Sequence, residues 1–180
     1  MIIAALSAAA ATLLVIAGIA KLRTPDPAAT MLVGLRPRLG PLRRARTVAR
    51  GAAVLELATG VAVLVAGGRI AATALLVCYL GLAAVALRLA VSGNHVRCGC
   101  FGAADGEVGA AHIALDLCGV VVAAAALAHP AGGIGALFAE GALRGSTVAA
   151  QAAVLAALGY LSITALPALS AARRSVEAGR

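Results

Sequence analysis

Five long apolar segments limit what this 180-residue chain can fold into. They cover about residues 2–20, 47–67, 70–90, 110–128 and 147–170, and a helix needs about 20 residues, at 1.5 Å each, to span about 30 Å of hydrocarbon. Hydrophobic residues make up 62% of the chain and charged residues 12%, whereas a soluble domain has about 25% charged residues. The chain is therefore predicted to be an all-α polytopic membrane bundle, in one integral membrane domain over residues 1–180. A disordered chain, a disulfide-stapled secreted protein and an ordinary soluble enzyme are excluded.

Three further sequence features predict how the spans begin and how they are connected. The first segment has no basic residue before its apolar run, so we expect a retained span and not a signal peptide. Residues 27–35 are apolar but too short to span, which favours a helix at the membrane surface. Gly67, Gly68 and Arg69 predict a tight turn between the second and third spans.

The net charge of +8 indicates orientation and not nucleic-acid binding. Eight of the 15 Lys and Arg residues lie in residues 21–50, and no aromatic residue is interleaved among them for base stacking. With five spans, thirteen basic residues fall on one side of the membrane and two on the other. The positive-inside rule then predicts a multi-pass cell-membrane protein with its N-terminus outside and its C-terminus and the 91–109 loop in the cytoplasm. The basic side also suits anionic lipid headgroups.

The 91–109 loop contains two cysteines separated by one residue, Cys98 and Cys100. Such a pair closes only a small, strained disulfide, which is easily reduced. Arg97 and His95 favour the thiolate, the form that attacks disulfides and binds metals. The loop is therefore a candidate redox dithiol, and the alternative is a soft-metal site for Hg, Cu or Zn formed by Cys98, Cys100 and His95.

Two further cysteines, Cys78 and Cys118, lie inside predicted spans. Each is about eight residues into its segment from opposite sides, so their depths differ by only about 6 Å. They form a candidate electron relay from the loop dithiol, or a thiolate path for a metal. The alternative is that each is a small buried hydrophobic side chain.

Ionisable residues also occur within or at the ends of the spans, where they are costly unless paired. The candidates gather in the half of the bilayer beside the cysteine loop: Lys21, Glu56, Arg88, Arg97, His112 and Asp116. They form either an ion-pair network, for example Lys21 with Glu56 and Arg88 with Asp116, or a proton-handling site. His112 and Asp116 are four residues apart, on one helix face, and suit a general base.

Three segments resemble the MauE family, membrane proteins associated with methylamine utilisation and related to the DoxX group. The most specific is Cys-Gly-Cys-Phe-Gly at residues 98–102, just after a span. Ala-Gly-Ile-Ala-Lys-Leu-Arg at 17–23 and Leu-Glu-Leu-Ala-Thr-Gly at 55–60 are also similar. Where the family commonly has an Arg-Asn pair in the fourth span, this chain has Leu115 and Asp116.

The resemblance implies a four-helix core, to which this chain adds one further transmembrane helix. It also implies a redox role with a thioredoxin-like partner, in forming disulfides during maturation of another protein. Cys98 and Cys100 match the family motif and take the thiol roles, with Cys98 expected to attack because Arg97 is adjacent. The chain would then act as a thiol–disulfide oxidoreductase. No cofactor is evident, and no residue argues for a quinone as the final acceptor. A non-catalytic scaffold of a membrane complex is a third alternative.

Overall fold

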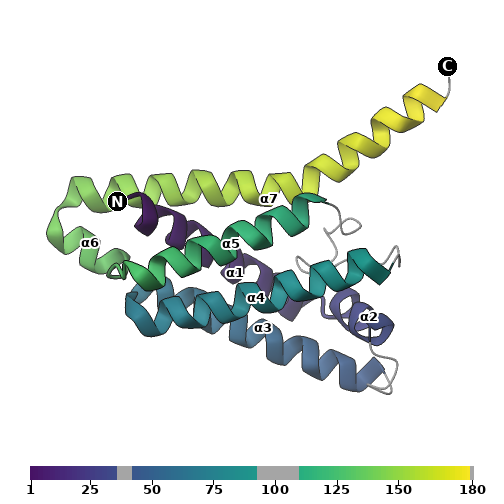
Figure 1. Ribbon diagram of the computed structural model, residues 1–180, viewed down its shortest axis with the longest axis horizontal. Coiled ribbons are helices and arrows are strands. Elements are labelled where there is room, and N and C mark those ends of the chain that lie inside the picture. The colour runs from purple at the N-terminus through teal and green to yellow at the C-terminus, as the bar shows by residue number, and fades with distance from the viewer. Residues whose placement is uncertain (36–41, 93–109, 179–180) are drawn as a thin grey trace.

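The computed structural model describes residues 1–35, 42–92 and 110–178. Figure 1 shows a bundle of long helices, with a shorter helix at each end of it. The described residues form seven helices: α1 (Ile2–Arg23), α2 (Asp26–Leu35), α3 (Leu42–Val65), α4 (Gly68–Ser92), α5 (Ala110–Ala128), α6 (Ile134–Glu140) and α7 (Ala142–Ala178).

The predicted all-α polytopic membrane bundle is confirmed. Five helices, α1, α3, α4, α5 and α7, are long and apolar enough to cross a membrane. They alternate in direction, so α1 and α4 end, and α3 and α5 begin, at the same end of the bundle (Figure 1). We call this end the basic end, because Lys21 and Arg23 close α1 there and four arginines occupy the first part of α3.

Helix α1 is the centre of the bundle and packs against α3, α5 and α7. Its contact with α3 is especially close, because glycines remove the side chains between the two backbones. A Cβ on Gly18 would lie 2.8 Å from the Ala53 carbonyl oxygen, and one on Gly60 would lie 2.6 Å from the Ala11 carbonyl oxygen. Small residues allow this approach in membranes, where helices gain little from the hydrophobic effect.

The predicted turn at Gly67-Gly68 is present, and both glycines have a positive φ, of 63° and 79°. This conformation suits glycine, since other residues rarely adopt it. The Gly68 amide donates to the Ala131 carbonyl at 2.9 Å, and the Gly133 amide donates to Ala66 at 3.2 Å. The turn between α3 and α4 is thereby joined to the connection between α5 and α6, at the end of the bundle opposite the basic end.

Two elements differ from the expectation. The connection between the predicted spans 110–128 and 147–170, expected to be a loop, contains the short helix α6, which packs against α7. Helix α7 begins at Ala142 and runs to Ala178, well beyond the predicted 147–170. Its C-terminal part bends away from the bundle (Figure 1), and Pro167 in that part lacks the amide that a straight helix requires.

The outer surface of the spans is apolar. Large hydrophobic side chains with more than half of their surface exposed include Val54, Leu55, Val77, Val121 and Leu158. A water-soluble protein rarely exposes so much apolar surface, whereas lipid tails solvate it. The bundle is therefore arranged with lipid-facing side chains outside and small residues inside.

Candidate functional site

Lys21 and Glu56 form a buried ion pair between α1 and α3. Lys21 Nζ lies 2.5 Å from Glu56 Oε1 and 2.7 Å from Oε2, and the two side chains are only 6% and 8% exposed. This is the pairing that the ion-pair alternative predicts. A buried charge without a partner costs several kcal/mol, so each group makes the burial of the other tolerable.

The close contact of α1 and α3 positions this pair. Gly18 lies one helical turn before Lys21, and Ala53 lies one turn before Glu56. The two helices run in opposite directions, and Gly18 contacts α3 at Ala53 and Leu57, which flank Glu56. Lys21 is one turn further along α1, and its long side chain reaches the Glu56 carboxylate across this close contact. The geometry of the ion pair thus depends on a glycine that carries no chemistry.

His112 and Asp116 lie on the buried face of α5, at 3% and 9% exposure. They line a small cavity of about 20 Å³ together with Lys21 and Tyr79. A cavity of this size holds about one water molecule. Four of the ionisable residues predicted to gather near the cysteine loop, Lys21, Glu56, His112 and Asp116, therefore come together inside the bundle, with Lys21 contacting both parts of the group.

Tyr79 closes this site from α4. Its hydroxyl donates a hydrogen bond of 2.9 Å to the Ala10 carbonyl on α1, and its ring lies against Gly119 on α5. The side chain is 3% exposed, so the hydrogen bond satisfies a hydroxyl that has no contact with solvent. Tyr79 was not among the predicted site residues, although a tyrosine is rare in a chain with 2% aromatic residues.

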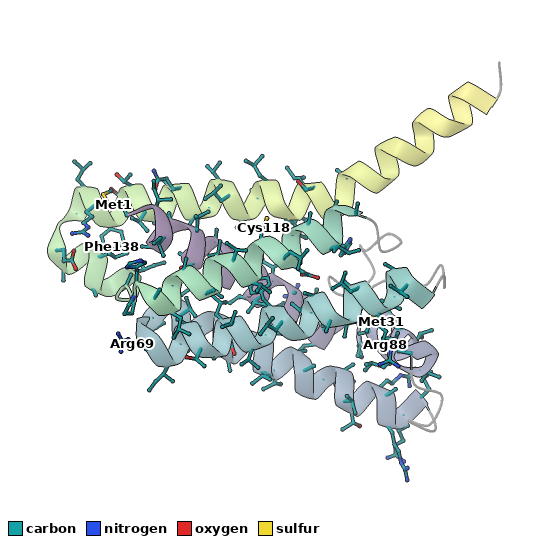
Figure 2. The ribbon with its side chains drawn as sticks, in the orientation of Figure 1. Met1, Met31, Arg69, Arg88, Cys118 and Phe138 are labelled. Atoms are coloured by element: carbon teal, nitrogen blue, oxygen red, sulfur yellow. The ribbon has the colours of Figure 1, made fainter. Side chains whose placement is uncertain are left out.

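Cys78 and Cys118 are free thiols in different surroundings. Cys78 is partly buried and its Sγ lies 3.5 Å from the Thr59 hydroxyl on α3. Cys118 is exposed on α5 and is labelled in Figure 2. The structure does not join the two sulfurs, and the electron relay between them stays a prediction.

Arg88 differs from the other charged candidates. It is exposed near the end of α4, at the opposite end of that helix from Arg69 (Figure 2), and within the described ranges it forms no ion pair with Asp116. The remaining candidates, Cys98, Cys100, His95 and Arg97, lie outside the described residues. Their segment joins α4 to α5 at the basic end, where Ser92 and Ala110 mark its two attachment points.

No group of three or more His, Cys, Asp and Glu side chains able to hold a metal ion occurs within residues 1–35, 42–92 and 110–178. His112 and Asp116 share a cavity with a lysine, whose positive charge opposes cation binding. The alternative metal site at Cys98, Cys100 and His95 is outside these ranges. The described polar group is thus better suited to protons than to a metal ion.

A family model described as methylamine utilisation protein MauE matches residues 1–138, which include α1 to α5 and the Cys-Gly-Cys-Phe-Gly segment. No curated protein and no solved structure matches the chain.

Proposed function

The chain belongs to the MauE family of methylamine utilisation proteins and is a multi-pass membrane protein. We propose that it exchanges electrons through a dithiol. In this proposal Cys98 and Cys100 react with a thioredoxin-like partner and support disulfide formation or maturation of another protein. One observation carries the proposal. Buried ionisable groups from three helices converge in the bundle whose basic end anchors the Cys-Gly-Cys segment.

The exchange needs only the two thiols and the partner's disulfide. The Cys98 thiolate attacks one partner sulfur, the partner S–S bond breaks, and the displaced thiolate takes up a proton. The Cys100 thiolate then attacks Cys98, which releases the second partner thiolate and closes the Cys98–Cys100 disulfide. The partner gains two electrons and two protons, and the membrane dithiol loses them. The same steps in reverse oxidise the partner.

The buried polar group supplies the proton chemistry in this proposal. Forming each thiolate releases a proton, and a His–Asp pair on one helix face is a suitable general base. Lys21 lines the cavity of His112 and Asp116 and also pairs with Glu56. Protonation of Asp116 or Glu56 therefore changes the electrostatic interaction of Lys21 with the other carboxylate. Electrostatic coupling across α1 would thus link the group's protonation to the redox state of the dithiol.

Trapping a mixed disulfide tests the proposal. Cys98→Ser and Cys100→Ser variants are expressed in a Cys78→Ala/Cys118→Ala background, and membranes are analysed on non-reducing gels. If Cys98 attacks, Cys100→Ser accumulates a reducible adduct with a thioredoxin-like protein, because the resolving thiol is missing. The matched Cys98→Ser variant should accumulate much less.

The outcome also separates the alternatives. Adducts in neither single variant, with both thiols freely reactive in the Cys78→Ala/Cys118→Ala background, would contradict the dithiol proposal. If added Hg²⁺ or Zn²⁺ then blocks that reactivity, the soft-metal function takes its place. If it does not, and the double Cys98→Ser/Cys100→Ser variant functions normally, the scaffold alternative takes its place.

A further inference from the structure

A second, larger cavity lies between α2, α3 and α4, beside the buried ion pair. Its volume is about 280 Å³, and of its thirteen lining residues only Lys21 and Glu56 are charged. Nothing in the dithiol chemistry described above uses this cavity. The His112–Asp116 cavity, at about 20 Å³, holds about one water molecule, whereas this cavity has room for an organic ligand.

The cavity results from the way α3 and α4 are arranged. The Gly67-Gly68 turn joins them at one end, and α2 lies beside them toward the basic end (Figure 1). An exposed ion pair between Arg46 and Asp26, with Nε and Oδ1 2.5 Å apart, ties α2 to α3. Helix α2 contributes Ala28, Met31 and Leu32 to the wall and so closes one side of the space.

The other side of the cavity is open to the lipid. Leu55 on α3 and Val77 on α4 are both 60% exposed, and Gly81 is exposed beside Val77 on the same face of α4. A ligand dissolved in the bilayer therefore has a direct entrance between α3 and α4. The inner wall is polar, because the Lys21–Glu56 pair and the Cys78 thiol lie there.

The inner wall offers both a hydrogen-bond donor and an acceptor within an apolar space. The Lys21 ammonium donates and the Glu56 carboxylate accepts. A ring whose oxygen atoms can be carbonyl or hydroxyl matches both groups, because a carbonyl accepts from Lys21 and a hydroxyl donates to Glu56. An apolar tail on the ring would suit the lipid-facing opening. A lipid acyl chain would use neither group. At about 280 Å³ the cavity is close to the lower limit of ligand pockets, about 300–1,000 Å³, so its size suits a single head ring whose tail remains in the lipid.

We propose that this cavity binds the head ring of a lipid-soluble quinone. The quinone carbonyl would accept a hydrogen bond from Lys21, and the quinol hydroxyl would donate one to Glu56. The inference rests on the proposed function for its purpose. When the exchange runs in the direction that oxidises the partner, Cys98 and Cys100 are left as two thiols. Closing their disulfide again then releases two electrons and two protons, which reduce one quinone to quinol. Binding itself does not require the dithiol.

Photolabelling tests the binding directly. The full chain is placed in nanodiscs and illuminated with an azido-substituted short-chain ubiquinone, and labelled peptides are located by mass spectrometry. We expect labels on α2, α3 or α4 residues at the cavity that an excess of unlabelled short-chain ubiquinone removes. An excess of a fatty acid should not remove them.

The chain offers a matched pair of variants. A Cβ on Gly81 or on Gly51 meets no atom within 4 Å, but only Gly81 lines the cavity. Gly81→Leu should therefore fill the space and lower labelling about tenfold or more, while Gly51→Leu leaves it within about twofold of the wild type. Equal labelling in the two variants, or equal competition by the fatty acid, would overturn the proposal and leave an adventitious lipid contact.

The Cys98→Ser/Cys100→Ser variant separates this inference from the proposed function. Its labelling should equal that of the wild type, because the cavity contains neither cysteine. Loss of labelling in that variant would contradict a quinone site in this cavity. A wild-type protein that forms mixed disulfides but shows no competed label would retain the dithiol function and lose the quinone site.

Discussion

Lys21 is the residue on which the interior of this bundle depends. It is 5% exposed, pairs with Glu56, and lines both the His112–Asp116 cavity and the cavity between α2, α3 and α4. Removing one member of a buried pair leaves the other charge in an apolar surrounding, whereas replacing both members removes the need for compensation. For a buried pair, single replacements should therefore lower the free energy of unfolding more than the double replacement does, a pattern that is not expected for a surface pair.

We expect Lys21→Met and Glu56→Leu each to destabilise the protein strongly, by about 3–5 kcal/mol, and the double variant to recover much of that loss. Thermal unfolding of the purified protein in detergent measures the difference. Arg46→Met, which breaks an exposed pair with Asp26, is the control and should change stability by about 1 kcal/mol or less. If the single variants were as stable as the wild type, this would contradict a buried ion pair between Lys21 and Glu56.

Asp116 has a different predicted role, in proton transfer. Asp116→Asn keeps the shape of the side chain but cannot accept the proton, so the rate of thiol exchange with a small disulfide should fall by about 10²-fold or more. Arg88→Gln, at an exposed position of α4, is the control and should leave the rate unchanged. Exchange at the wild-type rate in Asp116→Asn, in a sample whose unfolding temperature is unchanged, would leave only the ion-pair alternative.

The sequence indicated these polar residues because ionisable groups are rare and costly in a membrane span. It did not indicate Tyr79 or Thr59, since an aromatic or hydroxyl side chain in a span has no comparable cost. The Tyr79 hydroxyl contacts the Ala10 carbonyl and so links α4 to α1, whereas Thr59 contacts the Cys78 thiol and links the consecutive helices α3 and α4. Only the packing of α1, α3, α4 and α5 determines which of them meet.

At the scale of the elements, the crossing of α1 and α3 determines the site. Gly18 and Gly60 place the two backbones in contact, and the Lys21–Glu56 pair lies beside the Gly18 contact, whose partners on α3 are Ala53 and Leu57. A larger side chain at either glycine must separate the helices. The ion pair would then lengthen, even though neither charged residue is changed.

We expect Gly60→Leu to destabilise the protein by about 1–3 kcal/mol or to prevent folding, because its Cβ would meet the Ala11 carbonyl oxygen. Gly51→Leu, on the same helix with open space around it, is the matched control and should behave like the wild type. Thermal unfolding and the yield of monodisperse protein are the measurements. Equal behaviour of the two variants would show that α1 and α3 do not cross this closely.

Element boundaries followed the sequence where a strong signal marked them. The short helix predicted at 27–35 is α2, and the turn at Gly67-Gly68 has the backbone that glycine allows. Helix α6 was missed because seven residues rich in Gly and Ala carry no clear period. Helix α7 was predicted too short at its C-terminal end because a polar, proline-containing tail resembles the end of a helix, yet the helix continues past Pro167.

For the whole molecule, the orientation that the charge distribution predicts conflicts with the simplest form of the proposed function, in which the dithiol directly oxidises a client outside the membrane. The positive-inside rule predicts that the basic end, and with it the Cys-Gly-Cys segment, is cytoplasmic. A cytoplasmic dithiol faces a reducing thiol pool and cannot directly oxidise a client outside the membrane. Either the rule misplaces this segment, or the protein passes reducing equivalents across the membrane, for which a lipid-soluble carrier in the cavity beside Lys21 would be one route.

Fusion reporters test the orientation. A green fluorescent protein at the C-terminus should fluoresce, and alkaline phosphatase at the same position should be inactive, because both outcomes require a cytoplasmic C-terminus. Alkaline phosphatase placed between α3 and α4 should be active. The reverse pattern would place the dithiol outside, where it could oxidise a client directly.

The 280 Å³ cavity could not be predicted from the sequence. Apart from Lys21, Glu56 and Cys78, its lining residues are ordinary apolar residues of α2, α3 and α4, and the space arises from the arrangement of these three helices. The five spans, by contrast, follow from length and hydropathy alone. Local patterns therefore predicted the elements and the charged residues, and the arrangement of the helices determined where a ligand fits.

Counting reactive thiols tests the central claim most directly. In the Cys78→Ala/Cys118→Ala variant only Cys98 and Cys100 remain, and a maleimide of known mass reports each free thiol after rapid acid quenching of cells. The account predicts a population without labels that gains two labels per chain after mild reduction, with no such population in Cys98→Ser. Two labels per chain before reduction, unchanged by an added disulfide oxidant, would contradict a redox dithiol.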